Sequence, residues 1–175
     1  MNRAVFLDRD GVINYVKVID GKPYPPDSLA HLKLLPKVAD ALNLLHDAGY
    51  LLIVVTNQPD VARGKVSIDV VEEMNNFLKS SLPLDYIYSC YHDDYENCHC
   101  RKPKPGAFIE AASIYKIDLL KSFMVGDRWR DVEAGQSAGC KTFFIDYGYN
   151  EKHPDTQNYT VSSLYEAAKI IIGLD

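Results

Sequence analysis

Two aspartates separated by one residue, Asp8 and Asp10, follow an apolar run and precede Gly11. Residues i and i+2 of an extended chain point in the same direction, so both carboxylates can address one reacting centre. One could attack phosphorus while the other, protonated, donates to the leaving oxygen, and a divalent metal ion would offset their repulsion of a phosphate. The alternative is an acidic turn after a strand, because aspartate is common in turns.

Polar residues also follow three later apolar, β-branched runs. In open parallel α/β sheets, ligands bind outside the carboxyl ends of the strands, so groups at several strand endings can converge although they are far apart in sequence. We therefore interpret these endings as parts of one site with Asp8. They are Thr56-Asn57-Gln58, then Cys90 and His92, and then Gly126-Asp127-Arg128.

The apolar runs alternate with helical patterns, which predicts an α/β fold with a Rossmann-like parallel sheet and helices on both faces. The expected strands are Ala4–Leu7, Tyr50–Val55, Tyr86–Tyr88, Phe123–Val125 and Thr142–Ile145. The expected helices are Val38–Leu45 ending before Gly49, one opening near Ser67, Gly106–Tyr115, Asp131–Ala138 before Gly139, and one capped by Ser163 and Glu166. Tyr15–Pro36 is the longest stretch without such a pattern.

The bulk composition limits the class of protein. A chain of 175 residues suits one well-packed domain, and we expect a single domain over residues 1–175. Hydrophobic residues make up 47% and charged residues 25%, which excludes a disordered or membrane-embedded chain. No apolar run approaches a bilayer span and no signal-peptide pattern is present, so we expect a cytoplasmic protein without membrane contact. We also expect it to be a monomer. The formal net charge of -5 argues against nucleic acid as a partner.

Three cysteines and a histidine form the pattern Cys90-x-His92-x5-Cys98-x-Cys100. Three thiolates and one imidazole suit tetrahedral Zn²⁺, which could fold a loop too short to make its own core. Four protein ligands leave no open coordination position, so we expect this zinc to be structural. His99 is the rival nitrogen ligand, and reduced cysteines beside a chance histidine are the alternative explanation.

The ordered motifs resemble the haloacid dehalogenase superfamily of phosphotransferases across nearly the whole chain. The resemblance implies a haloacid dehalogenase-like fold without a large cap domain, with a zinc-stapled loop that uses His92 rather than His99. The superfamily motifs are Asp8-Arg9-Asp10-Gly11, Thr56-Asn57, Lys102-Pro103 and Gly126-Asp127-x-x-x-Asp131. Three segments look more narrowly like the branch of heptose bisphosphate and histidinol-phosphate phosphatases, namely residues 8–14, 56–64 and 98–106.

By that resemblance, Asp8 is the nucleophile that forms an aspartyl-phosphate, and Asp10 is the general acid and then the base. An attacking carboxylate needs positive charge to shield it from a phosphate. Mg²⁺ bound by Asp8, the Asp10 carbonyl and Asp127 can supply that charge, and Lys102 would add a second positive group.

The resemblance also implies contacts to the substrate. Thr56 and Asn57 would hold the transferring phosphate, and Arg101 with Lys102 would help bind substrate phosphate. Arg63 either closes over the site from another side or is an exposed loop arginine.

Three further charged residues each have two explanations. Arg9 and Arg128 flank acids, and each is either an ordinary surface ion pair or a substrate contact. Asp131 either orients Lys102 or the metal waters, or it is the first acid of a helix and serves the helix dipole.

We therefore predict a Mg²⁺-dependent phosphatase that releases the 7-phosphate of D-glycero-D-manno-heptose 1,7-bisphosphate, with a small phosphorylated sugar as its partner molecule. A histidinol-phosphate phosphatase is the nearest alternative, since the five-residue spacer between His92 and Cys98 fits it at least as well. A polynucleotide 3'-phosphatase is a further alternative, because a cap-free site can admit large substrates. A non-catalytic zinc-bearing interaction domain is the alternative from outside the enzymes.

Overall fold

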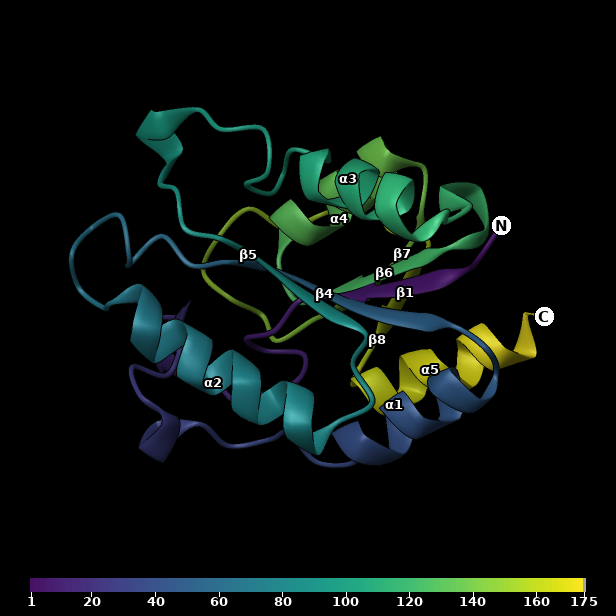
Figure 1. The fold of residues 1–175 in the computed structure, drawn as a ribbon, viewed down its shortest axis with the longest axis horizontal. Coiled ribbons are helices and arrows are strands. Elements are labelled where there is room, and N and C mark those ends of the chain that lie inside the picture. Colours follow the sequence, from purple (N-terminus) through teal and green to yellow (C-terminus); the bar gives the residue numbers. More distant parts are fainter. Residues whose placement is uncertain (175) are drawn as a thin grey trace.

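A six-stranded parallel sheet runs through the centre of the protein (Figure 1). The computed structural model describes residues 1–174. The strands lie in the order β5-β4-β1-β6-β7-β8, and every neighbouring pair is parallel. They are β1 (Ala4–Leu7), β4 (Leu51–Asn57), β5 (Tyr86–Cys90), β6 (Phe123–Gly126), β7 (Lys141–Ile145) and β8 (Tyr159–Val161).

Helices cover both faces of the sheet, as the sequence predicts. Figure 1 shows α1 (Val38–Asp47), α2 (Ile68–Ser81) and α5 (Leu164–Gly173) on one face, and α3 (Gly106–Tyr115) and α4 (Trp129–Ala138) on the other. Three short 3-10 turns complete the helical segments. They are η1 (Leu29–His31), η2 (Asp94–Glu96) and η3 (Leu119–Lys121).

The central strand β1 is apolar throughout because both of its faces are covered. Successive side chains of a strand point to opposite faces. Val5 and Leu7 accordingly belong to the apolar core under α1 and α5, whereas Ala4 and Phe6 belong to the core under α3. All four are fully buried, which is why the run does not alternate with polar residues.

The five predicted strands and five predicted helices are confirmed, and several of them have shifted ends. The side chain of Ser67 accepts a hydrogen bond from the Val70 N–H and caps α2. Ser163 caps α5 in the same way, but the Glu166 carboxylate accepts from Ser162 rather than closing a full capping box. The helix predicted from Asp131 begins two residues earlier, at Trp129.

The prediction that Tyr15–Pro36 lacks regular structure is wrong. It contains a hairpin of β2 (Lys17–Ile19) and β3 (Lys22–Tyr24), joined by Asp20 and Gly21 with φ of 51° and 74°. An Asp-Gly pair at positive φ is typical of a two-residue hairpin turn, so the signal was present in the sequence. The short edge strand β8 was also missed.

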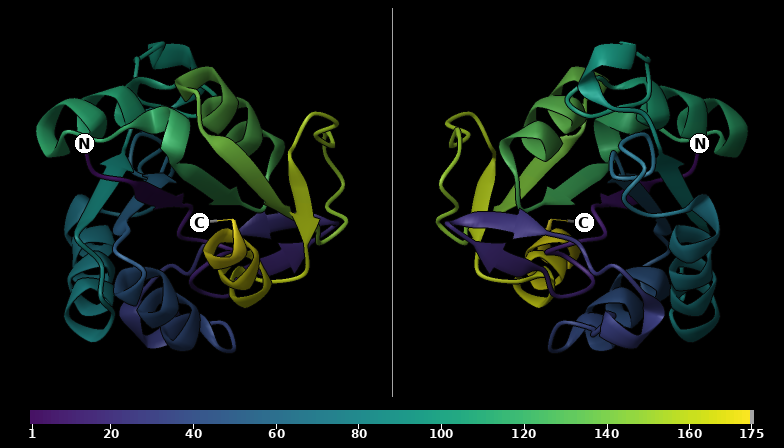
Figure 2. Two further views of the ribbon diagram at one scale, coloured as in Figure 1. Left: turned by 90° about the vertical axis from the view of Figure 1, so that its right-hand side faces the viewer. Right: turned by 90° about the vertical axis from the view of Figure 1, so that its left-hand side faces the viewer.

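The tip of this hairpin is attached to the segment that follows β7. The backbone N–H of Asn150 donates to the Gly21 carbonyl at 2.7 Å. Figure 2 shows the two segments side by side. The hairpin is therefore fixed across the carboxyl edge of the sheet.

The strand order reverses at β1, since β4 lies on one side of it and β6 on the other. Loops that leave neighbouring strands in opposite directions open a crevice at that point, where open α/β sheets bind ligands. Among the helices of residues 1–174, none combines the length and the apolar character required to cross a bilayer.

Candidate active site

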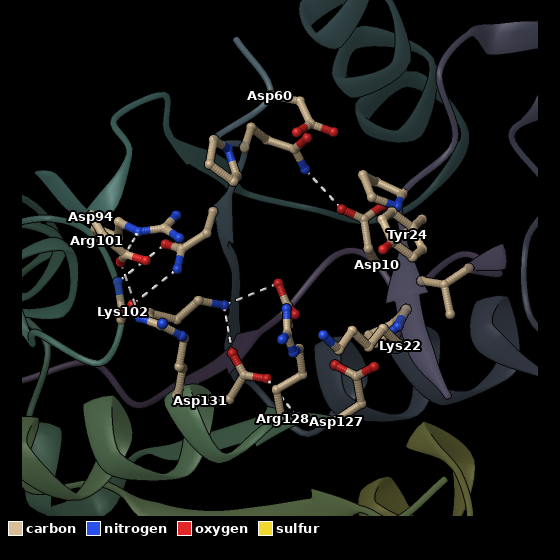
Figure 3. A pocket seen from close by; sticks show the side chains of 18 of the residues that line it. Asp10, Lys22, Tyr24, Asp60, Asp94, Arg101, Lys102, Asp127, Arg128 and Asp131 are labelled. Carbon is tan, nitrogen blue, oxygen red and sulfur yellow. Dashed lines mark hydrogen bonds and ion pairs between the residues drawn. The ribbon is translucent and has the colours of Figure 1, made fainter. Parts of the chain in front are cut away.

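The crevice at the carboxyl end of β1 is a cavity of about 290 Å³ lined mostly by charged and polar side chains (Figure 3). Asp8 follows β1, Asn57 ends β4, and Asp127 follows β6. Lys102 enters from the loop after β5, and Asp131 from the first turn of α4. The structure thus brings together residues that the sequence placed at separate strand endings.

Lys102 is the cation at the centre of the site. Its side chain is 2% exposed, and its Nζ lies 3.0 Å from Asp8 Oδ1 and 2.6 Å from Asp131 Oδ1. The ammonium also donates to the Val55 carbonyl at 2.6 Å. Burial alone would lower the pKa of Lys102, but the carboxylates of Asp131 and Asp8 outweigh it and raise that pKa above its ordinary value. The amine is therefore charged.

Asp131 performs both functions between which the sequence left a choice. Its Oδ1 orients Lys102, and its Oδ2 accepts the Arg128 backbone N–H at 3.0 Å, where α4 begins. An acid in this position also suits the positive end of the helix dipole.

Three carboxylates close to one another fit a hard divalent cation. One oxygen each of Asp8, Asp127 and Asp131 lies within 4.8 Å of the others, and all three residues are buried. Asp127 Oδ1 is buried without a hydrogen-bond partner, while its Oδ2 accepts from the Tyr149 hydroxyl at 2.9 Å. An unpaired buried carboxylate oxygen is costly, and oxygen ligands of this kind are those that Mg²⁺ prefers.

The acid cluster has perturbed proton affinities. Desolvation, followed by the negative charge of Asp131, raises the pKa of Asp8 to about 7, although Lys102 opposes the change. Desolvation and the charge of Asp8 raise the pKa of Asp127 well above its ordinary value. A bound cation would offset this concentration of negative charge, so the three carboxylates suit a divalent metal ion.

Gly11 is required beside this cluster. Its φ is +88°, and a Cβ there would lie 1.9 Å from Asp127 Oδ2. Only glycine lets the chain turn out of β1 while Asp127 approaches the backbone this closely.

Asp10 lines the same cavity and is held by three side chains. Its Oδ2 accepts from Gln58 Nε2 at 2.7 Å, and its Oδ1 accepts from Asn14 Nδ2 at 2.9 Å and Arg9 Nη2 at 3.1 Å. These donors fix the carboxylate at the edge of the site, two residues from Asp8.

Neither sequence-based explanation of Arg9 is correct. The residue is fully buried, so it is not a surface ion pair, and it does not line the cavity. Its guanidinium pairs with Asp10, and its Nη1 donates to Asn75 Oδ1 of α2 at 3.0 Å. Burial of an unpaired arginine would cost much free energy, which explains why the guanidinium has both Asp10 and Asn75 as partners.

Thr56 and Asn57 lie at the carboxyl end of β4, as predicted, but Asn57 lines the cavity and Thr56 does not. The buried Thr56 hydroxyl accepts from Gln58 Nε2 at 2.9 Å. The Asn57 amide makes two hydrogen bonds to the Lys102 backbone, to its carbonyl at 3.0 Å and from its N–H at 3.1 Å. The Asn57 side chain therefore fixes the loop that carries Lys102.

Arginines line the outer wall of the cavity, and each is paired with a carboxylate. Arg63 lines the cavity from the loop after β4, and its guanidinium binds Asp93. Arg101 binds Asp94 through Nε at 2.8 Å, and Arg128 binds Glu151. All three arginines proposed from the sequence as substrate contacts thus reach the site.

Other cavity residues were missed. Lys22 and Tyr24 come from the hairpin, and Arg130 from the first turn of α4. The Asp20-Gly21 turn signal could have placed the first two near an edge of the sheet, but nothing in the sequence indicated that the hairpin folds over this site. Figure 3 shows Lys22 and Tyr24 on the side of Asp10 and Asp127, opposite Arg101.

The three thiols and the imidazole form a second candidate metal centre. The Sγ of Cys100 lies 3.2 Å from Cys90 and 3.5 Å from Cys98, and His92 Nδ1 lies 3.5 Å from the Sγ of Cys90 and of Cys100. Zn–S bonds of about 2.3 Å give tetrahedral edges of roughly 3.8 Å, close to these separations. The donor set and its geometry therefore fit zinc.

His99 stands apart from this cluster. Its side chain is 76% exposed, and its Nε2 lies 3.9 Å from Glu110. The structure therefore places His92, not its rival, among the thiols. Cys140 is buried elsewhere in the core and packs there, as expected.

Comparison with known proteins gives matches over most of the chain. A family model described as HAD-hydrolase-like matches residues 99–167. The D-glycero-β-D-manno-heptose-1,7-bisphosphate 7-phosphatase of Pasteurella multocida is 37% identical over 99% of both chains. The enzyme of the same name from Haemophilus influenzae is 40% identical over 81% of this chain and 79% of its own length.

A solved structure is also similar along its whole length. The D,D-heptose 1,7-bisphosphate phosphatase from B. bronchiseptica, crystallised with magnesium and phosphate, superimposes with a TM-score of 0.86. It is 26% identical, and the match covers 99% of each chain. The predicted fold class is thereby confirmed.

Replacement of Lys102 by methionine should destabilise the protein by about 3 to 5 kcal/mol at pH 8, because it leaves two buried carboxylates without their partner. The Asp8 carboxylate, which Lys102 no longer stabilises, should then bind its proton more tightly in the folded than in the unfolded chain. The deficit should therefore shrink as the pH falls through about 7, the pKa region of Asp8. Denaturant unfolding at several pH values measures it, with the exposed Lys104→Met as the control. A deficit that stays constant with pH would contradict the buried ion cluster.

Proposed function

Because the chain belongs to the haloacid dehalogenase-like hydrolases, in the family of heptose-1,7-bisphosphate 7-phosphatases, we propose that it hydrolyses the 7-phosphate ester of D-glycero-β-D-manno-heptose 1,7-bisphosphate. The observation that carries this proposal is the buried cluster of Asp8, Lys102, Asp127 and Asp131, beside a cavity walled by arginines. The product would be the heptose 1-phosphate and inorganic phosphate.

In the first step, the Asp8 carboxylate attacks phosphorus and the bond from phosphorus to the sugar oxygen breaks. Asp10, protonated, donates its proton to that leaving oxygen. Lys102 stays within 3.0 Å of Asp8 and stabilises the negative charge that gathers around the transferring group. The result is an aspartyl-phosphate at Asp8.

In the second step, water attacks the aspartyl-phosphate while Asp10 takes up the proton of that water, and the bond from phosphorus to Asp8 breaks. Gln58, Asn14 and Arg9 hold the Asp10 carboxylate in place for both proton transfers. Asp8 returns to its starting state, so each cycle consumes only water and substrate.

We propose that Asp8, Asp127 and the Asp10 carbonyl hold Mg²⁺, with Asp131 beside them. When bound, this ion would neutralise phosphate oxygens and reduce their repulsion of the nucleophile. We further propose that Cys90, His92, Cys98 and Cys100 hold a structural Zn²⁺. Arg101 and Lys102 follow Cys100 directly, so the zinc loop would position both cations.

Asp8→Asn should abolish phosphate release, because an amide cannot attack phosphorus, and Asp10→Asn should slow it by about 10²-fold or more, because proton transfer is lost. Both side chains keep their shape, so the fold should persist. Phosphate release in the presence of Mg²⁺ is the assay, and circular dichroism verifies folding. A folded Asp8→Asn protein with near-normal turnover would exclude this nucleophile.

Purified protein should contain one zinc per chain that survives washing conditions sufficient to remove Mg²⁺, because thiolates bind zinc far better than they bind magnesium. Elemental analysis of protein prepared without chelator measures it. Cys98→Ser should lose the zinc and weaken substrate use more than Mg²⁺ binding at the acid cluster. Equal loss of Mg²⁺ affinity would point instead to collapse of the whole fold.

The heptose bisphosphate should be preferred over histidinol phosphate and a 3'-phosphorylated oligonucleotide. Its second phosphate can bind the arginines that line the cavity, whereas histidinol phosphate has no second phosphate. Arg101→Ala should therefore raise KM for the bisphosphate much more than for a monophosphate. A higher kcat/KM for histidinol phosphate, or an equal effect of Arg101→Ala on both substrate types, would overturn the substrate assignment.

A further inference from the structure

Three arginines from separate segments meet two neighbouring carboxylates beside the cavity. Asp93 and Asp94 follow the zinc-ligand candidate His92 and begin the short turn η2. Arg63 reaches them from the loop after β4, Arg101 from the loop after the thiol cluster, and Arg130 from α4. Arg63, Arg101 and Arg130 all line the cavity. The two acids therefore connect three parts of its wall.

Asp93 makes the best-defined contact of this group. Its two oxygens accept from Arg63 Nε at 2.6 Å and from Arg63 Nη2 at 2.8 Å, which is the bidentate arrangement that matches a guanidinium to a carboxylate. Its Oδ1 also accepts from the Asp94 backbone N–H at 2.8 Å. Both oxygens of the Asp93 carboxylate thus accept hydrogen bonds, and the side chain is only 12% exposed.

Asp94 extends the contact to the next two arginines. Its Oδ1 lies 2.8 Å from Arg101 Nε and 3.3 Å from Arg130 Nη1. Arg101 Nη2 in turn lies 4.0 Å from Asp93 Oδ1. Positive and negative groups therefore alternate along the wall, in the order Arg63, Asp93, Arg101, Asp94 and Arg130.

We propose that Asp93 is a positioning residue for substrate binding: it fixes the guanidinium of Arg63 in the orientation that receives the phosphate remote from the reacting centre. This inference rests on the proposed function for the identity of that phosphate. Asp93 does not line the cavity, so it acts through Arg63 and not on the substrate.

The physical gain is preorganisation. The Arg63 side chain is 39% exposed, and its other ion pair, from Nη1 to Asp60 at 3.5 Å, is longer than the contacts to Asp93. Without Asp93 the guanidinium would therefore sample more rotamers. An arginine that is already ordered loses less conformational entropy when it binds a phosphate. The expected effect of Asp93 is therefore on substrate affinity, not on the chemical step at Asp8.

Asp93→Asn in the zinc-loaded protein removes the charge and one acceptor while keeping the shape. It should raise KM for the heptose bisphosphate about three- to tenfold, the range expected for immobilising one long side chain, with kcat within about twofold of the parent. In an Arg63→Ala background the same change should add little, because Asp93 acts through Arg63.

Glu96→Gln is the matched control. The Glu96 carboxylate accepts from the Asp93 backbone N–H at 2.7 Å and so belongs to the same turn, but among the described residues it makes no hydrogen bond or ion pair with an arginine. KM should stay at the parental value in this variant. A rise equal to that of Asp93→Asn, or loss of zinc from Asp93→Asn, would show that the turn matters only for the folding of the loop.

Nitrogen relaxation of the arginine Nε–H groups tests the same inference without any substrate. The Arg63 Nε–H should be ordered in the parent and mobile in Asp93→Asn. If the parent fails to hydrolyse the bisphosphate, the proposed function falls, yet this measurement still decides the role of Asp93. An Arg63 side chain that is equally mobile in both proteins, or additive KM effects in the double variant, would overturn the proposal.

Discussion

One ammonium group shared between two buried carboxylates is the constraint on which this active site depends. Lys102 lies between Asp8 and Asp131, and Asp127 stands beside them with an unpaired oxygen. Three carboxylates against one cation leave negative charge in a buried place, where charge is costly unless it is compensated. The site is therefore built to receive a further cation, and with it a phosphate.

The surrounding structure keeps these charges in position. The Asn57 side chain accepts the Lys102 backbone N–H and donates to the Lys102 carbonyl, and the thiol cluster ends two residues before Lys102. Asp131 is fixed because its carboxylate also accepts the Arg128 backbone N–H at the start of α4. A preorganised site of this kind needs no rearrangement when charge moves from the phosphate to the leaving oxygen, and this is the main source of electrostatic catalysis.

The sheet, its helices and the convergence at the end of β1 could be predicted because hydrophobic periodicity and strand-end polarity are local signals. Asp8, Asp10 and Asp127 were found from the polarity of the strand ends, and Lys102 from the resemblance to the haloacid dehalogenase superfamily. The burial of Arg9 could not be predicted, since it depends on Asn75 of α2, which packs against it only in the folded chain. The Asp20-Gly21 pair indicated a hairpin turn, but not that the hairpin lies beside the cavity.

The acidic partners of the arginines that line the cavity could not be predicted from the sequence either. The ion pair between Arg63 and Asp93 joins residues thirty positions apart on two different loops, so no sequence period reports it. Long-range ion pairs are set by the topology of the strands that carry the loops, here the neighbouring strands β4 and β5. Sequence motifs identify the reacting groups more readily than the residues that orient them.

Covalent catalysis by Asp8 is the central claim, and trapping the intermediate tests it most directly. A rapid acid quench of the Asp10→Asn variant during turnover, followed by proteolysis and mass spectrometry, should find one phosphoryl group on the peptide that contains Asp8. The modification should disappear after treatment with hydroxylamine, which cleaves acyl phosphates. Turnover without any such adduct, or a phosphoryl group found on another residue, would contradict the mechanism.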